Sequence, residues 1–108
     1  MKGSAIGSPD EGYVLSAAAQ ADLREIWDHS ARNWGAEQAD RYILAIRDAC
    51  EAVADGRRQG RPIDDIRPGY RKLAVASHCL FYRITEAGLI DVIRILHQRM
   101  DVASRLQA

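Results

Sequence analysis

The sequence of 108 residues has few of the features that mark secreted or membrane-spanning proteins. Its two cysteines, Cys50 and Cys79, are too few for a disulfide framework and are expected to be reduced thiols of the core. No apolar run reaches the roughly 18 residues that a membrane span needs, and residues 1–12 lack the apolar stretch of a signal peptide. These absences predict a cytoplasmic protein, and the length excludes a two-domain enzyme.

Motifs of common enzyme classes are also missing. The sequence contains no P-loop, no G-x-S-x-G, no H-E-x-x-H and no cysteine pair at zinc-ligand spacing. Its three histidines, His29, His78 and His97, are scattered, and only His97 with Asp101 has a spacing that suggests metal ligands. We therefore expect no metal, no cofactor and no catalytic residue of these classes.

Lysine is scarce, and the charges are divided unevenly along the chain. Only Lys2 and Lys72 of the 15 Lys and Arg residues are lysine, a bias that favours bidentate contacts to carboxylates and phosphates. Residues 1–56 hold five basic and ten acidic residues, whereas residues 57–108 hold ten basic and five acidic ones. The two halves either neutralise each other within the fold or leave a basic surface for a partner.

Helical periodicity predicts a hairpin of two helices. Ser16 is a typical N-cap for a helix over 17–34, which Gly35 ends. A second helix over 36–54 is indicated by apolar residues three and four apart and is closed by Asp55-Gly56.

Strand-like periodicity surrounds this hairpin. Residues 13–15 form a short apolar run, and residues 71–76, 78–85 and 89–97 follow one another as an antiparallel meander with short turns. The predicted fold class is α+β, with the order β-α-α-β-β-β and the helical hairpin packed on a mostly antiparallel four-stranded sheet. Residues 13–108 are expected to be a single domain, after a disordered leader or cloning remnant over 1–12. Residues 57–69 are expected to be a long arginine-rich loop without periodicity.

Two groups of side chains are candidates for function. Basic and aromatic residues on or beyond the sheet could carry the acid, base and cations of a metal-free ribonuclease: Arg71, Lys72, His78, Tyr82, Arg83, Arg94, His97 and Arg99. Alternatively, these arginines pair with carboxylates or face solvent. The helical hairpin carries Trp27, Trp34 and Tyr42, which are either plain core or exposed anchors for an amphipathic helix of a partner.

An ordered set of segments resembles the ParE toxins of type II toxin–antitoxin modules, within the RelE/ParE superfamily. The segments are YVLS (13–16), ADLREIW (21–27), WGAEQADRY (34–42), GRP (60–62), DIRPGYRK (65–72), HCLFYR (78–83) and IRILHQRMD (93–101). The final R-I-L-H-x-R-M-D is the most recognisable of them.

This resemblance implies a toxin that a ParD-like antitoxin, a dimeric ribbon-helix-helix protein, holds inactive in a complex that represses its own operon. It further implies inhibition of DNA gyrase without catalysis; a ribosome-dependent mRNA endoribonuclease of the RelE type and an inactive remnant that only binds antitoxin are the alternatives. Operator DNA would be contacted only through the antitoxin. The candidates for antitoxin binding are Trp27, Ala31, Trp34, Tyr42 and Ile46. The candidates for contact with the target are Arg67, Arg71, Arg83, Arg94, His97 and Arg99.

Overall fold

The computed structural model describes residues 7–8, 12–100 and 102–106, and its two long helices match the predicted bounds. Helix α1 (Ala17–Trp34) begins after Ser16, whose Oγ accepts the Ala19 N–H at 3.0 Å. It ends at Gly35, which has a φ of +93° and donates its N–H to the Ala31 carbonyl. Helix α2 (Ala36–Ala54) follows directly, so the two helices form the expected hairpin.

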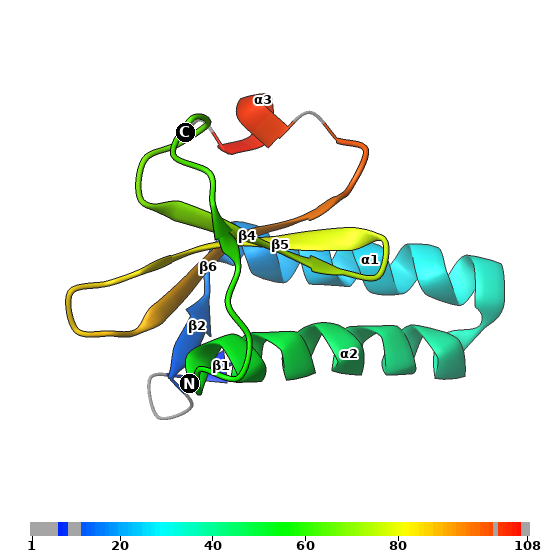
Figure 1. The fold of residues 1–108 in the computed structure, drawn as a ribbon. Coiled ribbons are helices and arrows are strands. Elements are labelled where there is room, and N and C mark those ends of the chain that lie inside the picture. Colours follow the sequence, from blue (N-terminus) through cyan, green and yellow to red (C-terminus); the bar gives the residue numbers. More distant parts are fainter. Residues whose placement is uncertain (1–6, 9–11, 101, 107–108) are drawn as a thin grey trace.

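The strands form a single sheet in the order β1-β2-β6-β5-β4-β3 (Figure 1). Strand β2 pairs with β6 in parallel, and the other neighbouring pairs are antiparallel, as the predicted mostly antiparallel sheet requires. The strand bounds are β1 (Gly7–Ser8), β2 (Tyr13–Leu15), β3 (Arg61–Pro62), β4 (Tyr70–Val75), β5 (His78–Ile84) and β6 (Ile90–His97).

The predicted α+β class is confirmed, but the predicted strand number is not. The sheet has six strands instead of four, because two-residue strands pair at both edges. Strand β1 lies within the segment expected to be a disordered leader, most of which is outside the described residues. Strand β3 lies within the segment expected to be a structureless loop, and a short helix, α3 (Val102–Leu106), follows the sheet.

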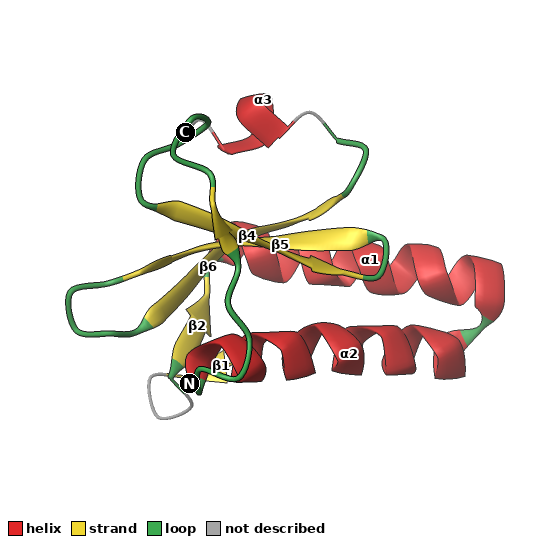
Figure 2. Cartoon of the chain, viewed as in Figure 1, coloured by secondary structure: helices red, strands yellow, loops and turns green. Residues whose placement is uncertain are grey.

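Two apolar clusters fill the two faces of the sheet. Helices α1 and α2 cover one face, and α3 lies over the opposite face (Figure 2). The larger cluster joins the helices to β2, β4, β5 and β6, with Tyr13, Ile46 and Tyr82 at 1% exposure or less. The smaller cluster gathers Ile63, Cys79, Phe81, Leu96 and Leu106, so the 57–69 segment contributes a buried anchor, Ile63. Within the described part of the chain, neither long helix is apolar enough to cross a membrane.

Candidate functional site

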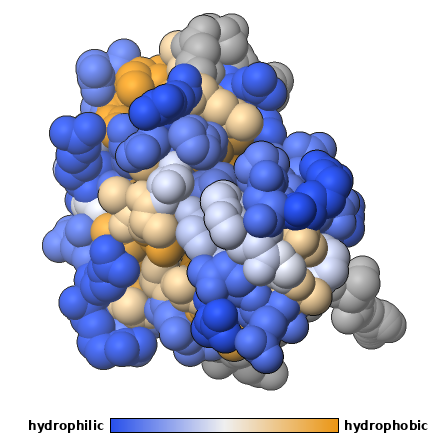
Figure 3. All heavy atoms as spheres, turned by 90° about the vertical axis from the view of Figure 1, so that its right-hand side faces the viewer, coloured by the Kyte–Doolittle hydropathy of each residue, from blue (hydrophilic) through white to orange (hydrophobic). Residues whose placement is uncertain are grey.

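A groove of about 770 Å³ lies between the helical hairpin and the sheet, on the side where the hairpin turns. Apolar and polar side chains from both helices, from the β4–β5 turn and from the end of β6 form its walls. The apolar lining consists of Ile26, Trp34, Tyr42, Ile95 and Met100. Figure 3 views this end of the molecule and shows apolar residues exposed among the hydrophilic surface.

Two large apolar side chains of the groove are exposed to solvent. Trp34, the last residue of α1, is 67% exposed, and Met100, after β6, is 41% exposed. The Trp34 ring touches His29 edge-on at a centroid distance of 6.2 Å. Exposed apolar side chains beside a groove are typical of surfaces that receive a partner.

A short polar chain crosses the floor of the groove. The Tyr42 hydroxyl lies 2.7 Å from His78 Nδ1, and its oxygen accepts the Ser77 N–H at 3.1 Å. The His78 ring meets the His97 ring edge-on, with centroids 5.3 Å apart. Burial lowers the pKa of His78 below 6.5, and the neighbouring His97 and His29 lower it further. In the tautomer that carries its proton on Nε2, the neutral His78 ring accepts a hydrogen bond from the Tyr42 hydroxyl at Nδ1.

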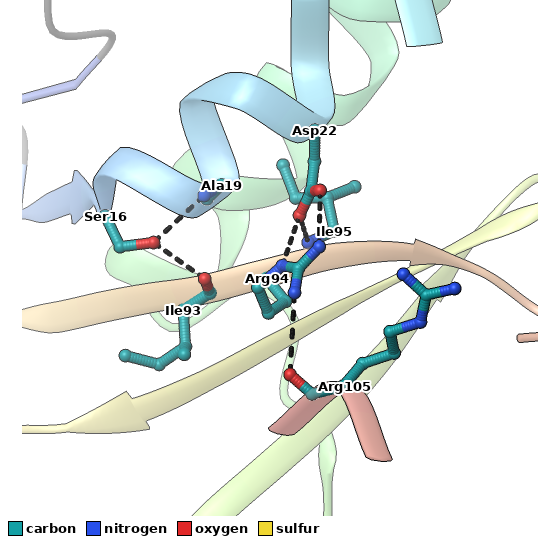
Figure 4. A network of polar contacts seen from close by, with 7 residues as sticks. All are labelled: Ser16, Ala19, Asp22, Ile93, Arg94, Ile95 and Arg105. Carbon is teal, nitrogen blue, oxygen red and sulfur yellow. Dashed lines mark hydrogen bonds and ion pairs between the residues drawn. The ribbon is translucent and has the colours of Figure 1, made fainter. Parts of the chain in front are cut away.

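A second polar network joins α1 to the sheet next to the groove (Figure 4). Arg94 Nε and Nη2 donate to the two carboxylate oxygens of Asp22, each at 2.8 Å. Asp22 also accepts the Ile95 N–H at 2.9 Å, and Ser16 Oγ donates to the Ile93 carbonyl at 2.6 Å. Strand β2 pairs with β6 only as far as Val92. Ser16 and Asp22 therefore provide hydrogen-bond partners for backbone groups of β6 beyond Val92, where the parallel pairing with β2 stops.

Similarity to known proteins identifies the family of this chain. The family model described as ParE toxin of type II toxin-antitoxin system, parDE, matches residues 13–102. This protein belongs to the ParE toxin family. As a member, it is the toxin component of a ParDE-type toxin–antitoxin system.

Individual ParE proteins support this assignment. Toxin ParE1 of Mycobacterium tuberculosis is 54% identical over 94 residues, which cover 87% of this chain and 96% of the relative. Toxin ParE1 of Caulobacter vibrioides is 39% identical over the same shares of the two chains. A solved structure described as the chromosomal ParDE TA system from P. aeruginosa has a TM-score of 0.67 and 25% identity, covering 77% of this chain and 90% of that one.

The five residues predicted to bind antitoxin do not lie together in this ParE fold. Trp34 and Tyr42 line the groove. Trp27 lies outside the groove lining and donates its Nε1–H to Asp40 Oδ1 at 2.8 Å, which ties α1 to α2. Ala31 is half-buried and also lies outside the lining. Ile46 is 1% exposed, so the prediction that it offers a surface contact is wrong; its place in the helical period makes it core.

Most of the arginines predicted to contact the target are held by internal partners. Arg67 donates to the Leu106 carbonyl and stacks over Tyr70, and Arg71 donates to the Gly60 carbonyl at 2.7 Å. Arg83 pairs with Asp91 at 3.2 Å. The hydrogen bonds of Arg94 with Asp22 raise the pKa of its guanidinium, and the Arg94 side chain is 22% exposed.

The remaining two candidates lie near the groove. His97 lines it, and Arg99 is exposed and donates its backbone N–H to His97 Nδ1 at 3.2 Å. Sequence reasoning missed Asp22 as a buried residue, although it lies three residues after Ala19 and four before Ile26, on the buried face of α1. In the described residues no three His, Cys, Asp or Glu side chains are grouped to hold a metal ion.

Proposed function

We propose that a ParD-like antitoxin neutralises this toxin by laying an amphipathic segment into the groove. The observation that carries the proposal is Trp34, which is 67% exposed at the end of α1 and lines the groove with Tyr42 and Met100. An amphipathic segment of the antitoxin would cover these apolar side chains. Ordering such a segment on binding costs free energy, which contacts with large apolar side chains offset. The description of the P. aeruginosa structure as a ParDE TA system is consistent with an antitoxin of this kind.

We further propose that the free toxin inhibits DNA gyrase by binding, in the cytoplasm, and that its complex with antitoxin represses the operon. A nuclease would need cations converging on one phosphate. In this fold Arg71, Arg83 and Arg94 are each engaged by Gly60, Asp91 and Asp22, respectively. Because these cations already have internal partners, we favour inhibition by binding over ribosome-dependent mRNA cleavage.

Paired substitutions test the antitoxin site. Trp34→Ala should weaken antitoxin binding at least tenfold, as expected for an aromatic anchor, with little change in the thermal midpoint. Leu44→Ala is the matched control, because Leu44 is 53% exposed on α2 but does not line the groove. Calorimetric titration of antitoxin into each variant measures the affinities. Equal affinities for Trp34→Ala and Leu44→Ala would contradict the groove as the docking site.

A further inference from the structure

A separate basic surface lies at the β3–β4 edge of the sheet, away from the residues of the groove. Strand β3 pairs with β4 so that Arg61 stands directly opposite Lys72. Directly opposed residues of an antiparallel pair place their side chains on the same face, close together. Arg58 lies at the same edge, where its Nη2 donates to the Ala74 carbonyl at 3.3 Å. We call Arg58, Arg61 and Lys72 the edge cluster.

Among the residues that the structure describes, Arg58, Arg61 and Lys72 form no ion pair, whereas the nearby Arg57 is paired with Asp55 at 2.7 Å. Like charges directly opposite each other destabilise a sheet. An anion that bridges Arg61 and Lys72 would remove this repulsion.

The backbone that carries Arg61 is held in place. Gly60 donates its N–H to the Tyr82 hydroxyl at 2.7 Å and accepts from Arg71 Nη1 at 2.7 Å. A Cβ at this position would lie 2.6 Å from the Lys72 carbonyl oxygen, so only glycine lets the segment approach β4 so closely. The backbone beneath Arg61 and Lys72 is therefore fixed before an anion binds, which lowers the cost of binding.

The charges are divided unevenly between the segment that carries the edge cluster and the two long helices. Residues 57–83 contain seven basic and two acidic residues, whereas α1 and α2 together contain four basic and seven acidic ones. An excess of basic residues in residues 57–83 favours the approach of a polyanion to this segment over its approach to the helices.

We infer that the edge cluster binds the phosphodiester backbone of duplex DNA, in addition to the proposed actions of the toxin on gyrase and antitoxin. Neighbouring strands lie about 4.8 Å apart, a spacing that lets adjacent cations reach successive phosphates. Three aromatic side chains lie beside the cluster. Phe81 and Tyr82 are 0% and 1% exposed, and the half-buried Tyr70 has the Arg67 guanidinium over its ring, 4.9 Å from the ring centroid. They offer no platform on which unpaired bases could stack, which favours a duplex over a single strand.

Fluorescence anisotropy with a labelled 20-base-pair DNA duplex tests the inference on the full-length toxin without gyrase. Wild type should bind at low salt, and the double variant Arg61→Gln/Lys72→Gln should bind at least tenfold more weakly. The slope of log affinity against log salt concentration should be shallower for this variant than for wild type by about 2, because each lost phosphate contact removes about 0.9 from the slope. The matched control is Arg24→Gln/Arg32→Gln, which removes two exposed cations from α1 and should bind as wild type does.

Unchanged antitoxin binding and an unchanged thermal midpoint would show that both double variants are folded. Equal DNA affinity of the two double variants would overturn the inference, as would an absence of duplex binding by wild type at low salt. Tighter binding of a single-stranded oligonucleotide or of polyglutamate than of the duplex would overturn it as well. The DNA-binding assay contains no gyrase, so a negative result in it does not bear on the proposed inhibition of gyrase. Conversely, a toxin that fails to inhibit gyrase can still be tested for duplex binding.

Discussion

Arg94 on β6 and Asp22 on α1 form a two-pronged ion pair, with both nitrogen–oxygen distances at 2.8 Å. The same carboxylate accepts the Ile95 N–H, and Arg94 also reaches the Arg105 carbonyl of α3 at 3.5 Å. One pair of side chains thus connects the helical hairpin, the interior strand β6 and the last helix. Arg94 therefore has a structural part in the fold, whatever contact it makes with a target.

Removal of the Asp22 carboxylate should destabilise the toxin strongly. The side chains of Asp22 and Arg94 are 11% and 22% exposed, respectively. Asp22→Ala therefore leaves the largely buried Arg94 guanidinium and the Ile95 N–H without their partner. Breaking a buried pair in this way should cost about 3 kcal/mol of unfolding free energy. Urea denaturation of wild type and variant measures the loss.

Arg83→Ala is the control for this prediction. It breaks the Arg83–Asp91 pair, in which the arginine side chain is 52% exposed, and should cost less than about 1 kcal/mol. Similar losses for Asp22→Ala and Arg83→Ala would show that the Asp22 network is no more important than a surface ion pair.

Stability should fall as the pH drops below about 6.5, through His78. Burial, followed by the charges of His97 and His29, holds the pKa of His78 below its unfolded value of 6.5, whereas Asp22 acts in the opposite direction. The unfolded chain therefore binds the proton first, so the unfolding free energy is fully retained above pH 6.5. It decreases as the pH falls from there to the folded pKa, and then this contribution levels off.

Urea denaturation between pH 5 and pH 7.5 measures this dependence. His78→Gln should reduce the slope of unfolding free energy against pH in that window. NMR titration of the His78 ring in the folded toxin provides a direct check. A ring that titrates at or above 6.5, or a slope unchanged by His78→Gln, would contradict the prediction.

The sequence predicted the helices better than the edges of the sheet, for physical reasons. Both helices carry caps and several turns of apolar periodicity, so the predicted bounds, 17–34 and 36–54, agree with the structure. Strands β1 and β3 have two residues each and exist because a neighbouring strand pairs with them, which no local period reveals. Helix α3 has five residues, too few for an amphipathic pattern.

The candidate site was predicted only in part. Trp34 and Tyr42 are large aromatic residues of the hairpin, and both line the groove. His78 and Met100 line it too, but they come from the sheet side, and their proximity to the hairpin depends on tertiary packing. Ile46 is a wrong candidate for antitoxin contact, because its place in the apolar period of α2 puts it in the core, where it is 1% exposed.

The most direct test of the proposed function is a plasmid assay with purified gyrase, ATP and antitoxin-free toxin. Supercoiling and trapped double-strand cleavage are scored against a reaction without toxin. We expect lost supercoiling or trapped cleavage. Antitoxin should reverse the effect of wild-type toxin, and should reverse that of Trp34→Ala only at higher concentrations. Normal supercoiling and no trapped cleavage in the presence of folded wild-type toxin would contradict this expectation, and cleavage of ribosome-bound mRNA would then be the activity to measure.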